Sequence, residues 1–364
     1  ELQQSYTGLR VKVHDFFALA APRINRFTQA CFIKMVSHFP PCYRWFYDLT
    51  CAIEHDSSVQ RWINSLGRHR LLDLLYTYNP RVIVCTFPTP AGVLSALRKK
   101  GVPVPPMVTV ITDVAVHNQW VNPHTQAYIV PDESMVSGLV EKDVSIDNIY
   151  PLGIPLRNSF NRLKPPAESR AVFGLRNDLF TVLIMGGAHG MMKGVTGICK
   201  ALGNYSSGLQ IVVVCGHNRL LLERLRKMEG SLANPMQAFG YVENIGDLMN
   251  VSDVLVSKAG GITVYESLTM GLPLLVYRPI PGQEEGNTRF LERIGAGKAI
   301  SSTENLVDSV LNLKNNSLAL DTMRSSALVH AKPNAATDAA ALIMDLALPS
   351  GYRQTDPLFA AQMA

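Results

Sequence analysis

The glycine-rich segment TVLIMGGAHGMMKG, residues 181–194, decides the fold class, because it joins an apolar run to the start of a helix. Residues 180–186 are predicted to form a buried strand, since a short apolar run is typical of a strand covered on both faces. The glycines Gly186, Gly187 and Gly190 then allow a tight turn. A strand, a turn and a helix in this order predict one unit of a parallel α/β sheet.

Strand-like runs alternate with longer amphipathic segments along the rest of the chain. On the N-terminal side, the predicted strands are residues 10–16, 81–87, 107–113 and 127–131, and the predicted helices are residues 22–54, 57–78, 91–100 and 132–142. On the C-terminal side, the predicted strands are residues 209–216, 236–242, 251–257, 273–279 and 298–301, and the predicted helices include residues 218–229, 263–270 and 335–346. The alternation predicts two doubly wound α/β halves.

A charged segment around Pro165 and Pro166 separates the two halves and is predicted to be a linker. The predicted domains are residues 1–160 and residues 161–334, followed by a helix and tail over residues 335–364. In open α/β sheets, ligands bind outside the carboxyl ends of the strands. Functional side chains are therefore expected in the strand-to-helix turns.

Length and composition narrow the class of protein. The chain has 364 residues, enough for two domains, and its net charge of +5 is too mild for a dedicated nucleic-acid binder. This charge suits anionic ligands or an anionic membrane surface. The six cysteines show no C-x-x-C spacing, which favours reduced thiols over a zinc site or a disulfide framework. We expect neither a membrane-spanning helix nor an export signal.

The second glycine-rich turn lies in VLVSKAGGITVYES, residues 254–267. Gly260 and Gly261 close a predicted strand, Thr263 is expected to cap the next helix, and Glu266 is expected in its first turn. Such a carboxylate either complements the helix dipole or accepts hydrogen bonds from the diol of a ribose. A single glycine-rich turn needs only a tight bend, but two of them with a placed carboxylate favour a nucleotide diphosphate.

The third turn, YRPIPGQEEGN at residues 277–287, holds polar side chains directly after an apolar strand. An exposed loop explains such a composition, and so does a sugar site, because amide and carboxylate groups match the donors and acceptors of hydroxyl groups. Together, the three turns predict a nucleotide-sugar site.

These motifs resemble the processive diacylglycerol glycosyltransferases and monogalactosyldiacylglycerol synthases of glycosyltransferase family 28. The resemblance is carried by residues 256–287, LIMGGAHG (183–190), VVVCGHN (212–218), TFP (86–88) and TDVAVHNQWVNP (112–123). It implies the GT-B fold, in which two Rossmann-like domains face a cleft and the C-terminal helix crosses back to the N-terminal domain. It also implies that the C-terminal domain binds a UDP-hexose and that the N-terminal domain presents diacylglycerol.

The resemblance also implies roles for individual donor-site residues. It matches the diphosphate turn to Gly187, Ala188 and His189, the uracil segments to Gly216, Tyr241 and Val242, and the second phosphate turn to Gly260, Gly261, Ile262 and Thr263. It matches the ribose carboxylate to Glu266, and the hexose-contacting pair to Gln283 and Glu284. The sequence contains no D-x-D motif, so no metal and no cofactor besides the UDP-sugar substrate are expected.

In the family, the general base comes from a first strand that ends in a glycine-rich turn with a histidine. No such motif follows Glu1, and the principal base is therefore expected upstream of it. Asp113 and His117 are the remaining acid–base candidates, expected to act at the acceptor site or to orient a group there. A turn-forming aspartate and a structural histidine are the alternatives for these two residues.

Residues 22–47 interleave aromatic and basic side chains, which is typical of a helix that lies in a membrane interface. The candidate membrane contacts are Arg23, Arg26, Phe27, Lys34 and Trp45. A helix packed on the N-terminal sheet is the alternative. With a lipid acceptor, we expect peripheral attachment to the cytoplasmic face of the cell membrane.

The function predicted from the sequence is transfer of a hexose, glucose or galactose, from a UDP-sugar to diacylglycerol with inversion. Two alternatives share the fold: a transferase acting on a polyprenyl-linked cell-wall precursor, and a nucleotide-sugar epimerase. A third belongs to another class, a non-catalytic nucleotide-sugar sensor or lipid-surface binding protein. No nucleic-acid partner is expected.

Overall fold

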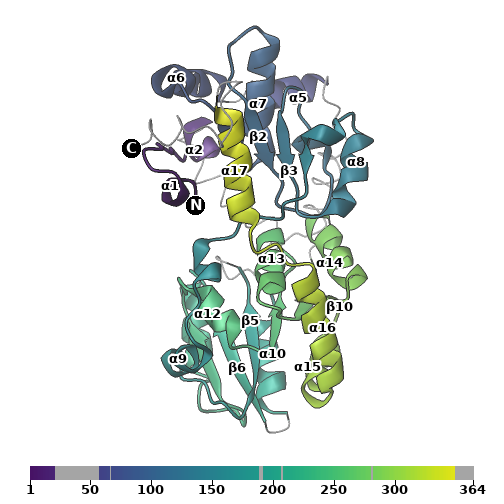
Figure 1. Ribbon diagram of the computed structural model, residues 1–364. Helices are drawn as coiled ribbons and strands as arrows, with labels where there is room; N and C mark the ends of the chain where they lie inside the picture. Colours follow the sequence, from purple (N-terminus) through teal and green to yellow (C-terminus); the bar gives the residue numbers. More distant parts are fainter. Residues whose placement is uncertain (21–56, 66, 188–191, 206–207, 280–281, 349–364) are drawn as a thin grey trace. The chain divides into compact units, whose positions relative to one another are not determined.

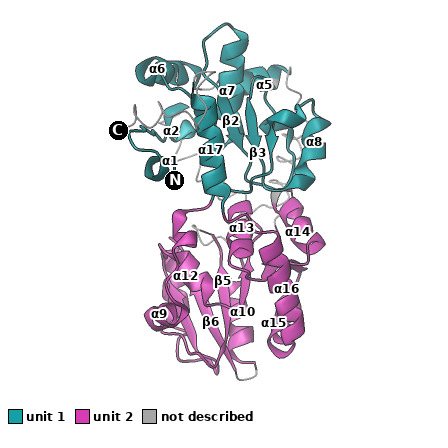
Figure 2. Cartoon of the chain, viewed as in Figure 1, with its two compact units in different colours: residues 1–155, 334–364 teal, residues 156–333 magenta. Residues whose placement is uncertain are grey.

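The computed structural model describes residues 1–20, 57–65, 67–187, 192–205, 208–279 and 282–348 (Figure 1). The predicted helix over residues 22–54 lies outside this part of the chain. The chain forms two compact units (Figure 2). Unit 1 consists of Glu1–Pro155 and Asn334–Ala364, and unit 2 consists of Leu156–Pro333.

Unit 1 is built on a parallel sheet with the strand order β1-β2-β3-β4. The strands are β1 (Ile83–Cys85), β2 (Met107–Val110), β3 (Ala127–Ile129) and β4 (Ile149–Tyr150). The helices are α1 (Leu2–Ser5), α2 (Phe16–Ala20), α5 (Ser58–Ile63), α6 (Arg68–Tyr78), α7 (Pro88–Lys99), α8 (Val136–Val140) and α17 (Ala335–Ala347). The 3-10 helices are η1 (Asn118–Trp120), η2 (Glu133–Met135) and η3 (Ile146–Asn148).

Two sequence predictions for unit 1 are wrong. Residues 10–16 form no strand, because the alternating valines face no neighbouring strand; Val13 is 91% exposed, and Phe16 already begins α2. The predicted helix over residues 57–78 is broken into α5 and α6. Gly67 precedes α6 with a φ of 69°, a left-handed conformation that cannot continue a helix.

Helix α17, the last helix of the described chain, packs on the sheet of unit 1 (Figure 1). Its side chains Ala339 and Ile343 join a buried cluster with Val108 of β2 and Ile129 of β3. The small alanine side chains of α17 let the helix approach the sheet closely. The predicted return of the C-terminal helix to the N-terminal domain is therefore confirmed.

Unit 2 contains a parallel sheet with the strand order β10-β9-β8-β5-β6-β7. The strands are β5 (Phe180–Met185), β6 (Leu209–Val214), β7 (Met236–Phe239), β8 (Val254–Ser257), β9 (Leu274–Tyr277) and β10 (Gly297–Ile300). Numbered within the sheet, this is the Rossmann order, in which the chain starts in the middle and builds outward in both directions. The order reverses between β5 and β8, and this pair is the topological switch point.

Helices cover both faces of the second sheet, as its strands require. The helices are η4 (Asn158–Asn161), α9 (Pro166–Val172), α10 (Val195–Gly203), α11 (Arg219–Arg226), α12 (Ile245–Asn250), α13 (Gly261–Thr269), α14 (Gln283–Arg293), α15 (Thr303–Asn315) and α16 (Ser317–Val329). On one face, Val182 and Ile184 of β5 pack against Ile198 and Leu202 of α10. Leu183, which points to the other face, is also fully buried.

The proline pair predicted to be a linker belongs to unit 2. The chain enters this unit at Leu156, and Pro165 and Pro166 begin α9. Proline suits the first position of a helix, because its fixed φ is helical and its missing N–H is one that the helix leaves unbonded.

We predict that Ile343→Ala lowers the free energy of unfolding of unit 1 by about 2–5 kcal/mol, because the substitution opens a cavity between α17 and the sheet. Urea unfolding measures the effect. Leu318→Ala is the matched control, since Leu318 of α16 is 76% exposed. Equal effects of the two substitutions would contradict the packing of α17 on unit 1.

Candidate active site

Two strand-to-helix turns meet at the switch point of unit 2. β5 and β8 are paired in parallel, with Val182 opposite Val254 and Ile184 opposite Val256, so their carboxyl ends lie side by side. The Ser257 hydroxyl at the end of β8 donates a hydrogen bond to the carbonyl of Met185 at the end of β5, at 2.7 Å. The structure thus brings together the two glycine-rich turns that the sequence singled out.

The turn after β8 leads directly into α13, which starts at Gly261. Gly260 has an ordinary φ of −67°, and a Cβ placed on it would meet no described atom within 4 Å. Neither the backbone nor the packing of the described residues therefore requires glycine here. The turn leaves open space beside the helix N-terminus, whose free N–H groups and dipole favour an anion.

Thr263 does not cap α13, contrary to the sequence prediction. It is the third residue of the helix, and Gly260 occupies the capping position without a side-chain hydrogen bond. The N-terminal N–H groups of α13 thus have no capping oxygen from this residue, which preserves them for an external acceptor.

The turn after β5 is described as far as Gly187 and again from Met192. Gly187 has a φ of 73° and Gly194, just before α10, has a φ of 79°, so both take a conformation that favours glycine. Ala188 and His189 lie outside the described residues, and their match to a diphosphate turn stays a prediction.

Two lysines stand at these turns, and the sequence analysis did not single them out. Lys258 lies between β8 and Gly260 and is half-buried, and burial lowers the pKa of its ammonium group. The Glu284 carboxylate raises this pKa, whereas the positive charge of Lys193 lowers it. An anion bound between the turns would stabilise both ammonium groups. The signal available in the sequence was a lysine within a few residues of each glycine turn.

The third turn is held against the second by an asparagine. Asn287 of α14 is fully buried, and its side-chain Nδ2 donates a hydrogen bond to the carbonyl of Ala259 at 2.8 Å. Glu284 lies in the first turn of the same helix and is also buried. The side chain of Gln283 lies outside the description, so its predicted hexose contact stays a prediction.

An aromatic stack follows β6 and β7. The imidazole of His217 and the ring of Tyr241 are parallel within 4°, with their centroids 4.9 Å apart. His217 directly follows Gly216, which has a φ of 56°, and Val242 is half-buried beside Tyr241. Tyr241 remains 48% exposed, so this ring offers apolar surface to a planar ligand.

Glu266 lies in the second turn of α13 rather than in the predicted first turn. It shares one side of the helix with Ile262 and Thr263, which precede it by four and three residues. Burial raises the pKa of Glu266 to about 7, and the Arg157 guanidinium opposes this rise. The carboxyl therefore exchanges its proton near neutral pH, and hydrogen bonds from a ligand would favour its ionised form.

Asp113 and His117 both follow β2 in unit 1. β2 ends at Val110, three residues earlier than predicted, and Asp113 is buried. His117 Nδ1 accepts a hydrogen bond from the backbone N–H of Gln119 at 3.1 Å and so caps η1. The capping role agrees with the structural alternative for His117, and it places the proton of the neutral ring on Nε2.

The remaining sequence candidates lie outside the described residues: Arg23, Arg26, Phe27, Lys34 and Trp45. No helix within the described ranges is long and apolar enough to cross a membrane. Over the same ranges, no three His, Cys, Asp or Glu side chains are grouped so that they would hold a metal ion.

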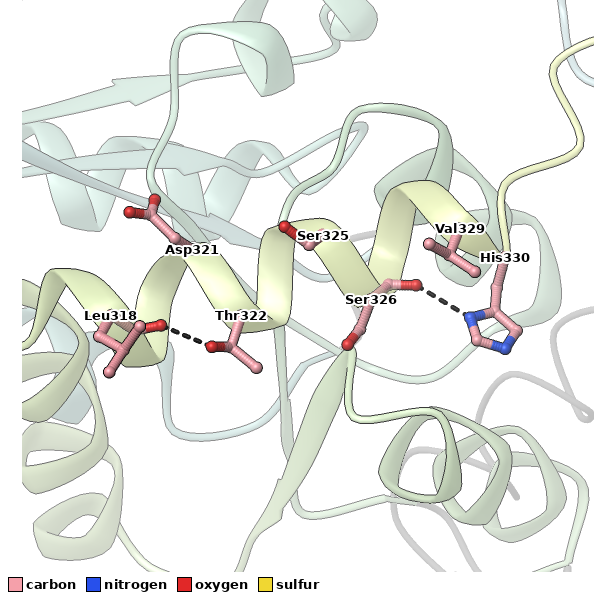
Figure 3. Close-up of a pocket in the computed structure, with 7 residues that line it drawn as sticks. All are labelled: Leu318, Asp321, Thr322, Ser325, Ser326, Val329 and His330. Carbon is pink, nitrogen blue, oxygen red and sulfur yellow. Dashed lines mark hydrogen bonds between the residues drawn. The ribbon is translucent and has the colours of Figure 1, made fainter.

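A surface hollow of about 460 Å³ runs along α16 (Figure 3). Thr322 and His330 line it, and their hydrogen bonds go to carbonyls of the same helix, those of Leu318 and Ser326. All the residues lining the hollow belong to α16 or directly follow it. No strand end contributes to it, and the candidate site remains at the switch point.

Solved structures share this architecture. Acinetobacter baumannii MurG aligns with a TM-score of 0.58 and 18% identity, over 77% of each chain. The S. aureus MnaA–UDP complex aligns with a TM-score of 0.60 and 15% identity, over 79% of this chain and 82% of that chain. The predicted fold is confirmed: two parallel α/β sheets, the second with glycine-rich turns at its switch point, define a GT-B protein.

Comparison of sequences identifies the family. Residues 1–156 match the monogalactosyldiacylglycerol (MGDG) synthase family, and residues 181–342 match the glycosyltransferase family 28 C-terminal domain. A processive diacylglycerol beta-glucosyltransferase from Bacillus pumilus (strain SAFR-032) is 33% identical over 87% of this chain and 82% of the relative. The Bacillus subtilis (strain 168) protein of the same name is 31% identical over 83% and 78%. The chain belongs to this family of diacylglycerol glycosyltransferases, as its motifs predicted.

We predict that Asn287→Ala lowers the free energy of unfolding by about 1–3 kcal/mol, because it leaves the buried carbonyl of Ala259 without its side-chain donor. Denaturant unfolding measures this loss. Asn305→Ala is the control, since the side-chain hydrogen bond of Asn305 to Ser301 is exposed. The prediction is wrong if the two variants are equally stable.

Proposed function

We propose that the chain transfers glucose or galactose from a UDP-sugar to the free hydroxyl of diacylglycerol, with inversion at the anomeric carbon, and so makes a membrane glycolipid. The observation that carries this proposal is the convergence of two glycine-rich turns, a helix N-terminus and a carboxyl group at one switch point. Family membership supplies the acceptor, because the relatives are named diacylglycerol glycosyltransferases.

The proposed donor site runs along the carboxyl edge of the unit 2 sheet. Uracil would stack on the exposed ring of Tyr241, and Glu266 would accept hydrogen bonds from the ribose diol. The diphosphate would bind the N-terminus of α13 and the turn that holds Gly187. The Glu284 carboxylate, which interacts electrostatically with Lys258, would accept hydrogen bonds from the hexose.

Departure of UDP would be stabilised by groups that the chain itself supplies. Negative charge grows on the diphosphate as the glycosidic bond breaks, and fixed N–H groups at a helix N-terminus stabilise this charge without rearrangement. Lys258 and Lys193 add two positive charges at the same turns. These groups support a mechanism without a metal ion.

The acceptor side of the mechanism is assigned to unit 1. A base removes the proton of the diacylglycerol hydroxyl, and the oxygen attacks the anomeric carbon from the face opposite UDP. The word "beta" in the relatives' names agrees with inversion of an α-linked donor. We assign an orienting role in this step to Asp113 and His117.

The proposal is tested by an assay of the full-length protein with diacylglycerol vesicles and a panel of UDP-sugars. We expect glycolipid from UDP-glucose or UDP-galactose, and a rate within about twofold in excess EDTA, well under the tenfold that 1.4 kcal/mol represents. Vesicles without diacylglycerol are the control. Absence of product with every sugar would overturn the function, and activity restored only by Mg²⁺ or Mn²⁺ would overturn the metal-free mechanism.

We predict that Glu266→Gln weakens UDP binding by about 1.5–3 kcal/mol above pH 8, where the native carboxyl is ionised. Because the pKa of Glu266 is about 7, native affinity should rise as the pH increases through 7 and then level off. Calorimetry on both proteins checks this. The terminal phosphate of UDP itself titrates near pH 6, and this affects UDP binding by the native protein and by the variant equally. Equal affinities at high pH would remove Glu266 from the donor site.

We also propose that the protein attaches peripherally to the anionic, cytoplasmic face of the membrane. Replacing Arg23, Arg26 and Lys34 with Gln should reduce co-sedimentation with anionic vesicles, because each basic residue near such a surface contributes about 1 kcal/mol. Binding should also weaken as salt is added.

The control for the vesicle experiment replaces Arg219, Arg224 and Lys227 with Gln, which removes the same charge from unit 2. UDP binding should survive both triple substitutions. If the two sets reduce sedimentation equally, net charge alone controls attachment.

A further inference from the structure

Residues 117–122, which follow β2 and begin with His117, are held by side chains from other elements of unit 1. Lys142, which follows α8, donates a hydrogen bond from Nζ to Oδ1 of Asn118 at 2.6 Å. The hydroxyl of Tyr128 on β3 donates to the carbonyl of Asn122 at 2.8 Å and accepts from its backbone N–H at 2.9 Å. The segment is therefore fixed near both of its ends.

Gln60 of α5 holds the middle of the same segment. The side-chain Nε2 of Gln119 donates a hydrogen bond to Oε1 of Gln60 at 2.7 Å. Nε2 of Gln60 in turn donates to Oδ1 of Asn64 at 3.0 Å. The three amides form a chain in which each donates to the next. Gln60 and Gln119 are 59 positions apart, so this chain of hydrogen bonds ties α5 to η1.

The chain of amides is enclosed by the protein. Gln60 is only 3% exposed. A Cβ placed on Gly92 of α7 would lie 2.5 Å from Oδ1 of Asn64 and 3.1 Å from Oδ1 of Asn122, so the glycine leaves the space that these amides occupy. Little water has access to replace a hydrogen bond lost here. The position of the Gln119 side chain therefore depends on Gln60.

Gln119 is also the residue that orients His117. Its backbone N–H donates the 3.1 Å hydrogen bond to Nδ1 of the imidazole. A neutral ring that accepts at Nδ1 carries its proton on Nε2. The same residue is thus anchored through its side chain by Gln60 and holds the histidine through its backbone.

We propose that Gln60 is a positioning residue for the acceptor step: by holding Gln119, it keeps the ring of His117 in one orientation and one tautomer. This inference rests on the proposed function, which gives His117 an orienting role, and it adds a residue of α5 that belongs to none of the motifs. With its proton on Nε2, the ring donates a hydrogen bond from that atom and cannot take up a proton there. His117 therefore orients the acceptor oxygen as a hydrogen-bond donor.

The kinetic experiment compares matched variants of the full-length protein with UDP-sugar and diacylglycerol vesicles. Gln60→Met removes the amide and keeps the length of the side chain. It should lower kcat about ten- to hundredfold, because a displaced orienting group costs rate, and should leave KM for the UDP-sugar within about twofold. Gln60→Glu keeps an oxygen that accepts from Gln119 and should restore most of the rate.

Gln126→Met is the matched control for Gln60→Met. Oε1 of Gln126 accepts a hydrogen bond at 2.7 Å from the backbone N–H of Met107, where β2 begins. The substitution therefore removes a side-chain hydrogen bond of unit 1 at the opposite end of β2 from His117, and kcat should stay native. In a His117→Ala background, Gln60→Met should lower kcat no further, because the residue through which it acts is absent.

A spectroscopic experiment reads the histidine without any substrate. Nitrogen-15 spectra of histidine-labelled protein at about pH 8.5 report which ring nitrogen carries the proton of the neutral imidazole. The signal of His117 is assigned by its absence from the His117→Ala spectrum. The native protein and Gln126→Met should show the Nε2 tautomer. Gln60→Met and Gln119→Met should show a mixture of the two tautomers.

Each result decides the inference. A native kcat in folded Gln60→Met, an equal loss of kcat with and without His117, or an unchanged tautomer in Gln60→Met overturns the positioning role. If Gln60→Met does not fold, Gln119→Met removes the same hydrogen bond from the half-buried partner and decides by the same criteria.

The two experiments also separate this inference from the proposed function. A native protein that transfers no sugar overturns the proposed function, and the acceptor role of Gln60 with it, even where the tautomer changes as expected. A native protein that transfers sugar, with variants that keep the native tautomer and kcat, overturns this inference alone.

Discussion

The parallel pairing of β5 with β8 is the constraint on which the proposed donor site depends. Because the chain leaves these neighbouring strands in opposite directions, no single connection covers their carboxyl ends. The hydrogen bond from Ser257 to Met185 ties the ends together. This strand pair positions the glycine turns, the N-terminus of α13 and the two lysines. Asn287 holds the third turn against them by donating a hydrogen bond to the carbonyl of Ala259, beside Gly260.

Desolvation and charge oppose each other throughout this site. Burial disfavours the charged form of both Glu266 and Lys258. A neighbouring opposite charge, Arg157 for Glu266 and Glu284 for Lys258, favours the charged form again. Such groups respond strongly to a ligand, because hydrogen bonds or opposite charge from the ligand replace the missing water. The free protein thus bears an electrostatic cost that binding of a nucleotide diphosphate would relieve.

The sequence was informative where function depends on local chain geometry. Glycine turns after apolar runs located the strand ends around Gly187 and Gly260, and the periodicity identified two α/β halves that the structure confirms. It placed Thr263 at the capping position and Glu266 in the first turn, whereas α13 already starts at Gly261. The start was missed because Gly260, which occupies the capping position, has no side chain to indicate a cap. It misread residues 10–16, since alternating valines indicate a strand only where a neighbouring strand accepts them.

The long-range side chains could not be found this way. Arg157 lies outside every motif, and its hydrogen-bond partner Tyr241 is 84 residues away. No local sequence pattern predicts such a contact. Lys258 lies inside a recognised motif, but its properties come from burial and from Glu284 and Lys193, which only the folded chain brings near. Resemblance to a family supplied roles for matched positions and none for these contacts.

The packing of α17 on β2 and β3 also fixes an order of events during synthesis. Unit 2 is one continuous stretch, so all of its strands have been synthesised before α17 is made. Until then, one face of the unit 1 sheet, including Val108 and Ile129, lacks its cover. The unit whose synthesis begins first is therefore the one that is completed last, because it waits for α17.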